Sequence, residues 1–137
     1  MSGLNAAEIA ALEEALDDEY HAFTTYDQVI ADFGNVRPFS NIRNAEMRHI
    51  DALLRLFERY GREPPANRWV GRVKRYASLG EACADAVRAE LNNAALYDRL
   101  LAATTRADLL AVFGNLREAS QERHLPAFRR CVARDAR

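Results

Sequence analysis

Hydrophobic side chains recur every three or four residues along four long segments of this chain. In the first segment they are Ile9, Leu12, Leu16, Phe23, Tyr26, Ile30 and Phe33. This spacing gathers them on one face of an α-helix, which has 3.6 residues per turn. The helices are expected at residues 6–33, 38–60, 79–103 and 106–133. The pattern therefore predicts an all-α protein in which four helices bury one face each in a bundle.

The connection over residues 61–77 is much longer than the other two. A helix of about 24 residues is roughly 36 Å long, whereas 17 residues can stretch to about 55 Å. The connection can therefore run the full length of the bundle and return the chain for the third helix. We expect Trp69 and Val70 to pin it to the helices.

Length and charge limit the classes of function. The 137 residues fit one domain, 1–137, and the net charge is −1, with 19 basic and 20 acidic residues. No global field attracts nucleic acid or an anionic membrane, and we expect the charges of the basic, aromatic stretch 62–76 to face water. The chain has neither an 18-residue apolar run nor a signal-peptide pattern, so we expect a soluble, cytoplasmic protein.

Single polar residues interrupt the hydrophobic faces of the helices. Glu19 and Glu90 are the charged residues on the first and third faces, Glu46 and His49 lie side by side on the second, and His124 lies on the fourth. Buried carboxylates without a cation would repel one another and take up protons. Carboxylates and imidazoles are also ligands for transition metals. We therefore expect a metal site inside the bundle. The alternative is a metal-free polar layer balanced by arginines such as Arg43, Arg48, Arg117 and Arg123.

The two halves of the chain repeat one motif. Glu19-x6-Tyr26-Asp27 in the first half is matched by Glu90-x6-Tyr97-Asp98 in the second. Tyr26 and Tyr97 lie two turns from the glutamates on the same faces. They are either ordinary core residues or an outer shell that bonds to the ligands or passes electrons.

The fourth helix contains a shift in its hydrophobic pattern. Its first half follows Leu109, Phe113, Leu116 and Ser120, whereas its second half follows Gln121, His124, Phe128 and Cys131. The two patterns differ by one residue, and a helix absorbs one inserted residue most simply as a π-bulge. Pro126 is expected to kink the helix just beyond it.

The polar residues follow the order Glu19, Glu46-x-x-His49, Glu90 and His124. Together with three segments, this order resembles the ferritin-like superfamily. The segments are Asp17-Asp18-Glu19-Tyr20, Arg37-Pro38-Phe39-Ser40-Asn41-Ile42 and His124-Leu125-Pro126-Ala127-Phe128. This superfamily includes rubrerythrins, bacterioferritins and related di-iron carboxylate proteins, and the chain looks like a small-domain branch of it. The resemblance covers nearly the whole chain. It implies a ferritin-like four-helix bundle with a long crossover between helices 2 and 3.

The resemblance also implies a ligand set. Glu19, Glu46 and His49 would serve one metal, and Glu90 and His124 would serve the other. Gln121 stands where the superfamily has a second bridging glutamate, and an amide is a weaker, neutral ligand. Glu118 and Glu122 lie off the core face, so we expect both in solvent. The site would hold one or two ions, with iron expected and another divalent metal as the alternative.

Cys83 lies seven residues before Glu90, and Cys131 lies seven residues after His124. On antiparallel helices this places both cysteines at the same level near one end of the bundle. A cytoplasmic location favours two reduced core thiols. The alternative is a redox-active pair that reduces what the metal site oxidises.

Two functional hypotheses follow from these features. The first is a metal-binding, oxidoreductase-like protein whose reduced iron reacts with oxygen or peroxide. The second is a non-enzymatic helical interaction or structural module that keeps a degenerate, metal-free polar layer. Either is compatible with a homodimer.

Overall fold

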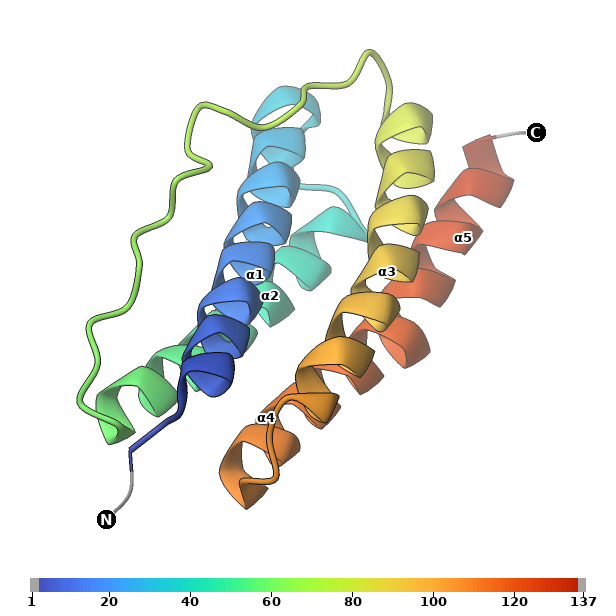
Figure 1. Cartoon of the computed structure of the whole chain (residues 1–137). Coiled ribbons are helices and arrows are strands. Elements are labelled where there is room, and N and C mark those ends of the chain that lie inside the picture. Colours follow the sequence, from blue (N-terminus) through green and yellow to red (C-terminus); the bar gives the residue numbers. More distant parts are fainter. Residues whose placement is uncertain (1–2, 136–137) are drawn as a thin grey trace.

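The computed structural model describes residues 3–135, and all regular structure in this part of the chain is helical (Figure 1). The elements are α1 (Ala6–Phe33), α2 (Phe39–Arg59), α3 (Leu79–Ala102), α4 (Ala107–Ala119), the π-helical segment η1 (Ser120–His124) and α5 (Leu125–Asp135). The prediction of an all-α fold is confirmed. The observed helix ends lie within two residues of the expected ones.

Two helix starts follow from local sequence. Asn5 and Glu8 form a reciprocal capping box at the start of α1, and the Ser78 hydroxyl accepts a hydrogen bond from the Glu81 backbone N–H at the start of α3. Both bonds satisfy N–H groups that the first turn of a helix leaves unpaired. The start of α4 is different, because Arg106 precedes its first residue and provides no side-chain cap.

The connection between α2 and α3 runs along the outside of the helices from one end to the other (Figure 1). Trp69 anchors it, because its ring packs against that of His21 with 4.1 Å between centroids and its indole N–H donates to Asp17 at 3.2 Å. Arg68 also binds Asp17 with two hydrogen bonds of 2.8 and 2.9 Å. The expectation that Val70 helps to pin the segment is wrong, since Val70 is 72% exposed. The polar contacts of its neighbours hold the chain instead.

Two hydrophobic clusters fill the bundle, one toward each end. One cluster is built around Leu12, Leu16, Leu53, Phe57, Tyr97, Leu100, Leu109 and Phe113. The other is built around Tyr26, Val29, Phe39, Ile42, Cys83, Ala86 and Phe128. Glu19, Glu46, Glu90 and His124 each lie in sequence between members of the two clusters. The polar residues therefore form a layer with apolar packing on both sides.

The structure joins Cys83 and Cys131 in a disulfide, with 6.1 Å between the Cα atoms. Cys83 is fully buried on α3 and Cys131 lies on α5. The two cysteines lie at the same level, as their spacing from Glu90 and His124 predicts. The expectation of two reduced thiols is wrong for this structure, and the bond fastens α3 to α5.

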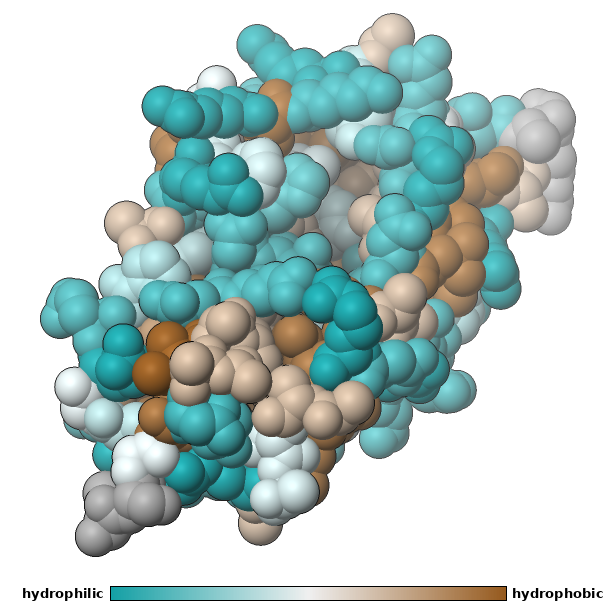
Figure 2. Space-filling model, viewed as in Figure 1, coloured by the Kyte–Doolittle hydropathy of each residue, from teal (hydrophilic) through white to brown (hydrophobic). Residues whose placement is uncertain are grey.

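None of the helices in residues 3–135 combines the length and the apolar character that a membrane span requires. The face of the molecule seen in Figure 2 is mostly hydrophilic, with smaller hydrophobic patches between the polar side chains.

Candidate metal centre

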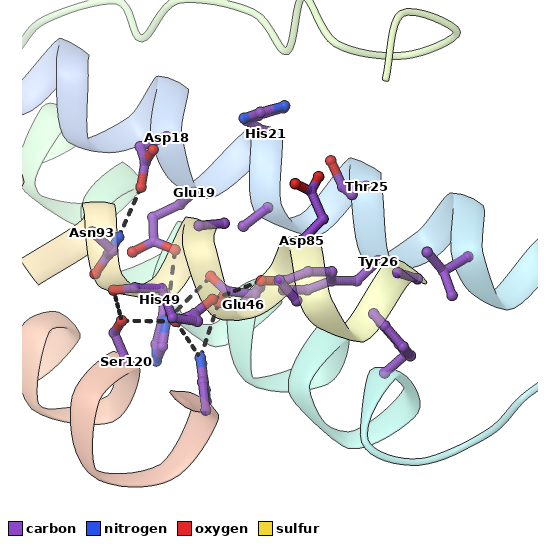
Figure 3. A pocket seen from close by; sticks show the side chains of 18 of the residues that line it. Asp18, Glu19, His21, Thr25, Tyr26, Glu46, His49, Asp85, Asn93 and Ser120 are labelled. Carbon is purple, nitrogen blue, oxygen red and sulfur yellow. Dashed lines mark hydrogen bonds and ion pairs between the residues drawn. The ribbon is translucent and has the colours of Figure 1, made fainter. Parts of the chain in front are cut away.

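Five side chains from four parts of the bundle, among them Glu19, Glu46 and His49 in Figure 3, converge in the polar layer between the two hydrophobic clusters. They form two overlapping groups, one of Glu19, Glu46 and His49 and the other of Glu46, Glu90 and His124. Within each group the candidate ligand atoms all lie within 4.8 Å of one another. The structure therefore brings together all five residues that the sequence pattern selects.

Glu46 belongs to both groups because its two carboxylate oxygens face different histidines. Its Oε2 lies 3.5 Å from Nδ1 of His49, and its Oε1 lies 3.2 Å from Nδ1 of His124. The two imidazole rings are stacked, with 5.6 Å between centroids. One carboxylate is thus placed between two sets of donors, which is the position of a bridging ligand.

Several ligand atoms of this cluster lack a hydrogen-bond partner. The side chains of Glu46 and His124 are almost completely buried, yet Glu46 Oε2, His49 Nδ1 and His124 Nδ1 accept and donate no hydrogen bond. A buried polar atom without a partner costs roughly 1–3 kcal/mol. The three atoms lie in ion pairs of 3.2 to 3.8 Å with the facing carboxylates and histidines but make no hydrogen bond, so they are open to a further ligand. Oxygen and imidazole nitrogen donors suit a transition metal ion.

The repeated Glu-x6-Tyr motif produces a crosswise pair of hydrogen bonds between α1 and α3. The Tyr97 hydroxyl donates to Glu19 Oε1 at 2.7 Å, and the Tyr26 hydroxyl donates to Glu90 Oε2 at 2.6 Å. The helices are antiparallel, so each tyrosine reaches the glutamate of the other copy. Both tyrosines therefore contact candidate ligands, as the interpretation of an outer shell that bonds to the ligands expects. Each bond fixes one carboxylate oxygen and leaves the other facing a histidine.

Replacing Tyr97 by phenylalanine should weaken metal binding by about 10–100-fold, the usual effect of losing an outer-shell partner. Without the hydroxyl, Glu19 loses the bond that orients it toward His49. Isothermal titration calorimetry with Fe(II) or Mn(II) would measure the affinity. Tyr60→Phe is the matched control, because Tyr60 donates at 2.7 Å to Asp108, outside the cluster. Equal losses in both variants would contradict the assigned role of Tyr97.

The π-helical segment confirms the predicted bulge and explains how the last helix serves the site. Leu116, Ser120, His124 and Phe128 are all buried at steps of four. In an ideal α-helix such steps would drift by about 120° over three turns. The wider turn of η1 takes up most of this drift. As a result Ser120 from the first pattern and His124 from the second both face the polar layer.

Ser120 is a site residue that the sequence analysis did not select. Its hydroxyl donates to Glu90 Oε1 at 2.7 Å. Gln121, the weak ligand candidate, directs its amide nitrogen to the main-chain oxygen of Glu90 at 2.6 Å and to the Ser120 hydroxyl at 2.8 Å. That end of the Gln121 side chain is therefore committed to structural bonds. The signal for Ser120 was present, because it lies on the hydrophobic face at the height of the ligands.

The carboxylates and the histidines shift one another's pKa. Burial and the neighbouring charge of Glu46 raise the pKa of Glu19 to about 8. Burial alone would raise the pKa of Glu46 too, but the contacts with Glu19 and both histidines outweigh it and lower this pKa. The proton of the acidic pair therefore resides on Glu19.

Burial also opposes the charged form of the histidines, but the facing carboxylates outweigh it. Glu19 and Glu46 raise the pKa of His49 to about 10, and Glu46 and Glu90 raise that of His124 to about 9. Without a metal, both imidazoles are therefore protonated at neutral pH. The two positive charges occupy the places that cations would take.

Arginine does not supply the counter-charge in this layer. Arg43 binds Asp27 and Arg117 binds Asp98, each at 2.8 Å on the surface. Arg48 and Arg123 are exposed, and so are Glu118 and Glu122, as expected. Within residues 3–135, the cationic partners of the three cluster carboxylates are the two histidines.

Asp18 is a second residue that the sequence did not distinguish from its neighbours. It accepts a hydrogen bond of 2.8 Å from the Asn93 side chain beside the cluster. Burial and the charge of Glu19 raise the pKa of Asp18 to about 7. Asp18 is rotated by about 100° from Glu19 around α1, so the hydrophobic pattern does not place it on the core face. Only the packing of α3 shows that Asp18 is covered.

No protein-family model matches the sequence, and no curated protein matches it either. Solved structures do match. Hypothetical protein MJ0754 from Methanococcus jannaschii DSM 2661 superposes with a TM-score of 0.87 at 22% identity, over 99% of this chain and 85% of that one. A conserved hypothetical protein, Rv2844, from Mycobacterium tuberculosis superposes with a TM-score of 0.81 at 19% identity, over 93% of this chain and 92% of that one. At these identities the likeness shows a shared fold.

Proposed function

We propose that this protein binds one or two divalent metal ions, with iron as the expected metal, at Glu19, Glu46, His49, Glu90 and His124. The observation that carries the proposal is the position of Glu46, whose two oxygens face two separate groups of donors. Glu19 and His49 would complete the ligands of one ion, and Glu90 and His124 those of the other. The unpaired buried atoms of the cluster would then gain partners.

We further propose that the bundle is ferritin-like and that the site reacts with oxygen or peroxide. The long connection between α2 and α3 and the five-residue donor set support this proposal. Bound reduced iron would supply the electrons for that reaction. The residues of this chain would hold the ligands in place: Tyr97 orients Glu19, while Tyr26 and Ser120 orient Glu90.

A second candidate is a metal-free polar layer in a structural module. It is favoured by the protonation of the cluster, since two protonated histidines and a protonated Glu19 would offset the remaining carboxylate charge. The commitment of Gln121 to the main chain of Glu90 also favours it. Under this hypothesis the positive charges of the two protonated histidines always take the place of metal ions.

Metal content and thermal stability separate the two candidates. Protein purified from iron-supplemented cells should contain about one to two metals per chain by elemental analysis. At a free metal concentration 100 times the dissociation constant, metal binding would stabilise the fold by about 2.7 kcal/mol. A chelator should therefore lower the melting temperature. Metal-free protein whose melting temperature is unchanged by added Fe(II), Mn(II) or Zn(II) would refute metal binding and support the structural module.

Metal affinity should rise steeply with pH between about 6 and 9. His49 and His124 have pKa values raised to about 10 and 9, so both are protonated in the metal-free protein at pH 7. A metal must displace these protons, and each displaced proton contributes up to about tenfold in affinity per pH unit. Calorimetry at one pH in buffers of different ionisation enthalpy would count the released protons. A reaction heat that is independent of the buffer would contradict the expected proton release.

A further inference from the structure

A cavity of about 190 Å³ lies between α1 and α3 and includes the ligand cluster, since all five candidate ligands are among its lining residues (Figure 3). Its lining extends from Asp18 to Val29 on α1 and from Ala82 to Asn93 on α3. At 1.5 Å per residue this is roughly 17 Å along each helix. The five candidate ligands occupy only part of this length, so the cavity continues well beyond the metal site.

Small side chains create this space. The two helices face each other there with Ala22 and Thr25 on one side and with Ala82, Ala86 and Ala89 on the other. Protein interiors are otherwise packed as densely as organic crystals, with few voids larger than a water molecule. A dry cavity of about 150 Å³ is large enough to bind benzene. The space between α1 and α3 therefore suits a small organic molecule.

The walls of the cavity differ between its parts. Val29, Phe39 and Ala86, together with Tyr26, make one part largely apolar, whereas the carboxylates and histidines of the cluster make the other part polar. The apolar part disfavours a charged group, because a charge buried there would lose its hydration without compensation. Asp18, Asp85 and the cluster carboxylates outnumber Lys74 in the lining, so the polar part disfavours an anion as well.

We propose that this cavity binds a small, uncharged, mainly apolar organic molecule with one hydroxyl group directed at the ligand cluster. In the metal-free protein the hydroxyl would meet Glu46 Oε2, which accepts no hydrogen bond and lies 3.5 Å from His49 Nδ1; with metal bound, this oxygen would serve the metal and the hydroxyl would face the bound ion. The ring or short alkyl part would fill the space lined by Ala82, Ala86 and Phe39. Such a molecule would be the substrate of the proposed metal site, and this role rests on the proposed function. Binding of the molecule depends only on the cavity.

Titration of the metal-free protein with phenol, cyclohexanol and benzene tests the inference. Saturable binding should be seen by calorimetry and by NMR shifts, tightest for the two probes with a hydroxyl. Ala86→Leu and, from the facing helix, Ala22→Leu should each weaken binding by about tenfold or more, equivalent to about 1.4 kcal/mol. Two variants are used because either could disturb folding.

Ala52→Leu is the matched control. Ala52 lines a second pocket, between α2 and α4, which shares only His49 and Leu116 with the first, so this substitution should change phenol affinity by less than about twofold. Failure of all three probes to bind the wild-type protein would overturn the inference, as would equal binding by the wild-type protein and both cavity variants. An Ala86→Leu variant that only slows metal uptake would instead show the cavity to be an ion path. Metal stoichiometry, measured separately, decides the proposed function whatever the probes do.

Discussion

Replacing Glu46 by glutamine is expected to abolish metal binding in both groups at once. Glu46 is the residue that the two groups share, with Oε2 at 3.5 Å from His49 and Oε1 at 3.2 Å from His124. Glutamine has nearly the same shape but offers one neutral oxygen in place of two charged ones. We expect the affinity for Fe(II) or Mn(II) to fall by more than about 100-fold, beyond the effect of losing an outer-shell partner.

The number of metal ions bound per chain tests whether the two groups share Glu46. Glu19→Gln should remove only the ion held with His49, whereas Glu46→Gln should remove both. Glu118→Gln is the control, because Glu118 is exposed on the same bundle. Elemental analysis and calorimetry on the three variants would measure the effect. Full metal content in Glu46→Gln protein would show that the cluster is not a shared site.

Reduction of the Cys83–Cys131 disulfide is expected to lower the free energy of unfolding by about 4 kcal/mol. The bond closes a loop with a sequence separation of 48, and the loss of chain entropy in the unfolded state gives a value of this size. For a chain of this length the melting temperature should fall by roughly 10–20 °C. Circular dichroism melts with and without a thiol reductant would measure the shift.

The control for this prediction is the Cys83→Ala, Cys131→Ser double variant. Its melting temperature should match that of the reduced protein and should not respond to reductant. Thiol titration of the unfolded wild-type protein should find two thiols after reduction and none before. An equal thiol count under oxidising and reducing conditions would mean that the bond does not form in solution. In that case the favoured interpretation of two free thiols would return.

Much of the helical structure could be predicted because it depends on local spacing. The steps of three and four residues in α1 and the capping box of Asn5 and Glu8 are complete within a short stretch of chain. The π-bulge at Ser120–His124 was also predictable, since one inserted residue shifts the hydrophobic pattern inside a single helix. Such signals need no knowledge of neighbouring helices.

The contacts between helices could be predicted only in part. Glu19 and Glu90 were selected because an isolated charge interrupts each hydrophobic face, but the sequence did not show that each accepts a bond from the tyrosine of the other repeat. The sequence did not distinguish Asp18 from its acidic neighbours, and only the position of Asn93 on α3 shows its contact. Val70 was expected to be buried, but the connection lies so that Trp69 turns inward and Val70 outward.

The sequence by itself determined four amphipathic helices, the height of the polar layer on each of them and the residue types within it, because a period of 3.6 residues fixes which side chains share a face. The tertiary structure alone decided that Glu46 lies between two histidines, that the tyrosines bond crosswise and that Cys83 meets Cys131. Each of these contacts joins residues of different helices. Their geometry depends on how closely and in what orientation the helices pack, which no local pattern encodes.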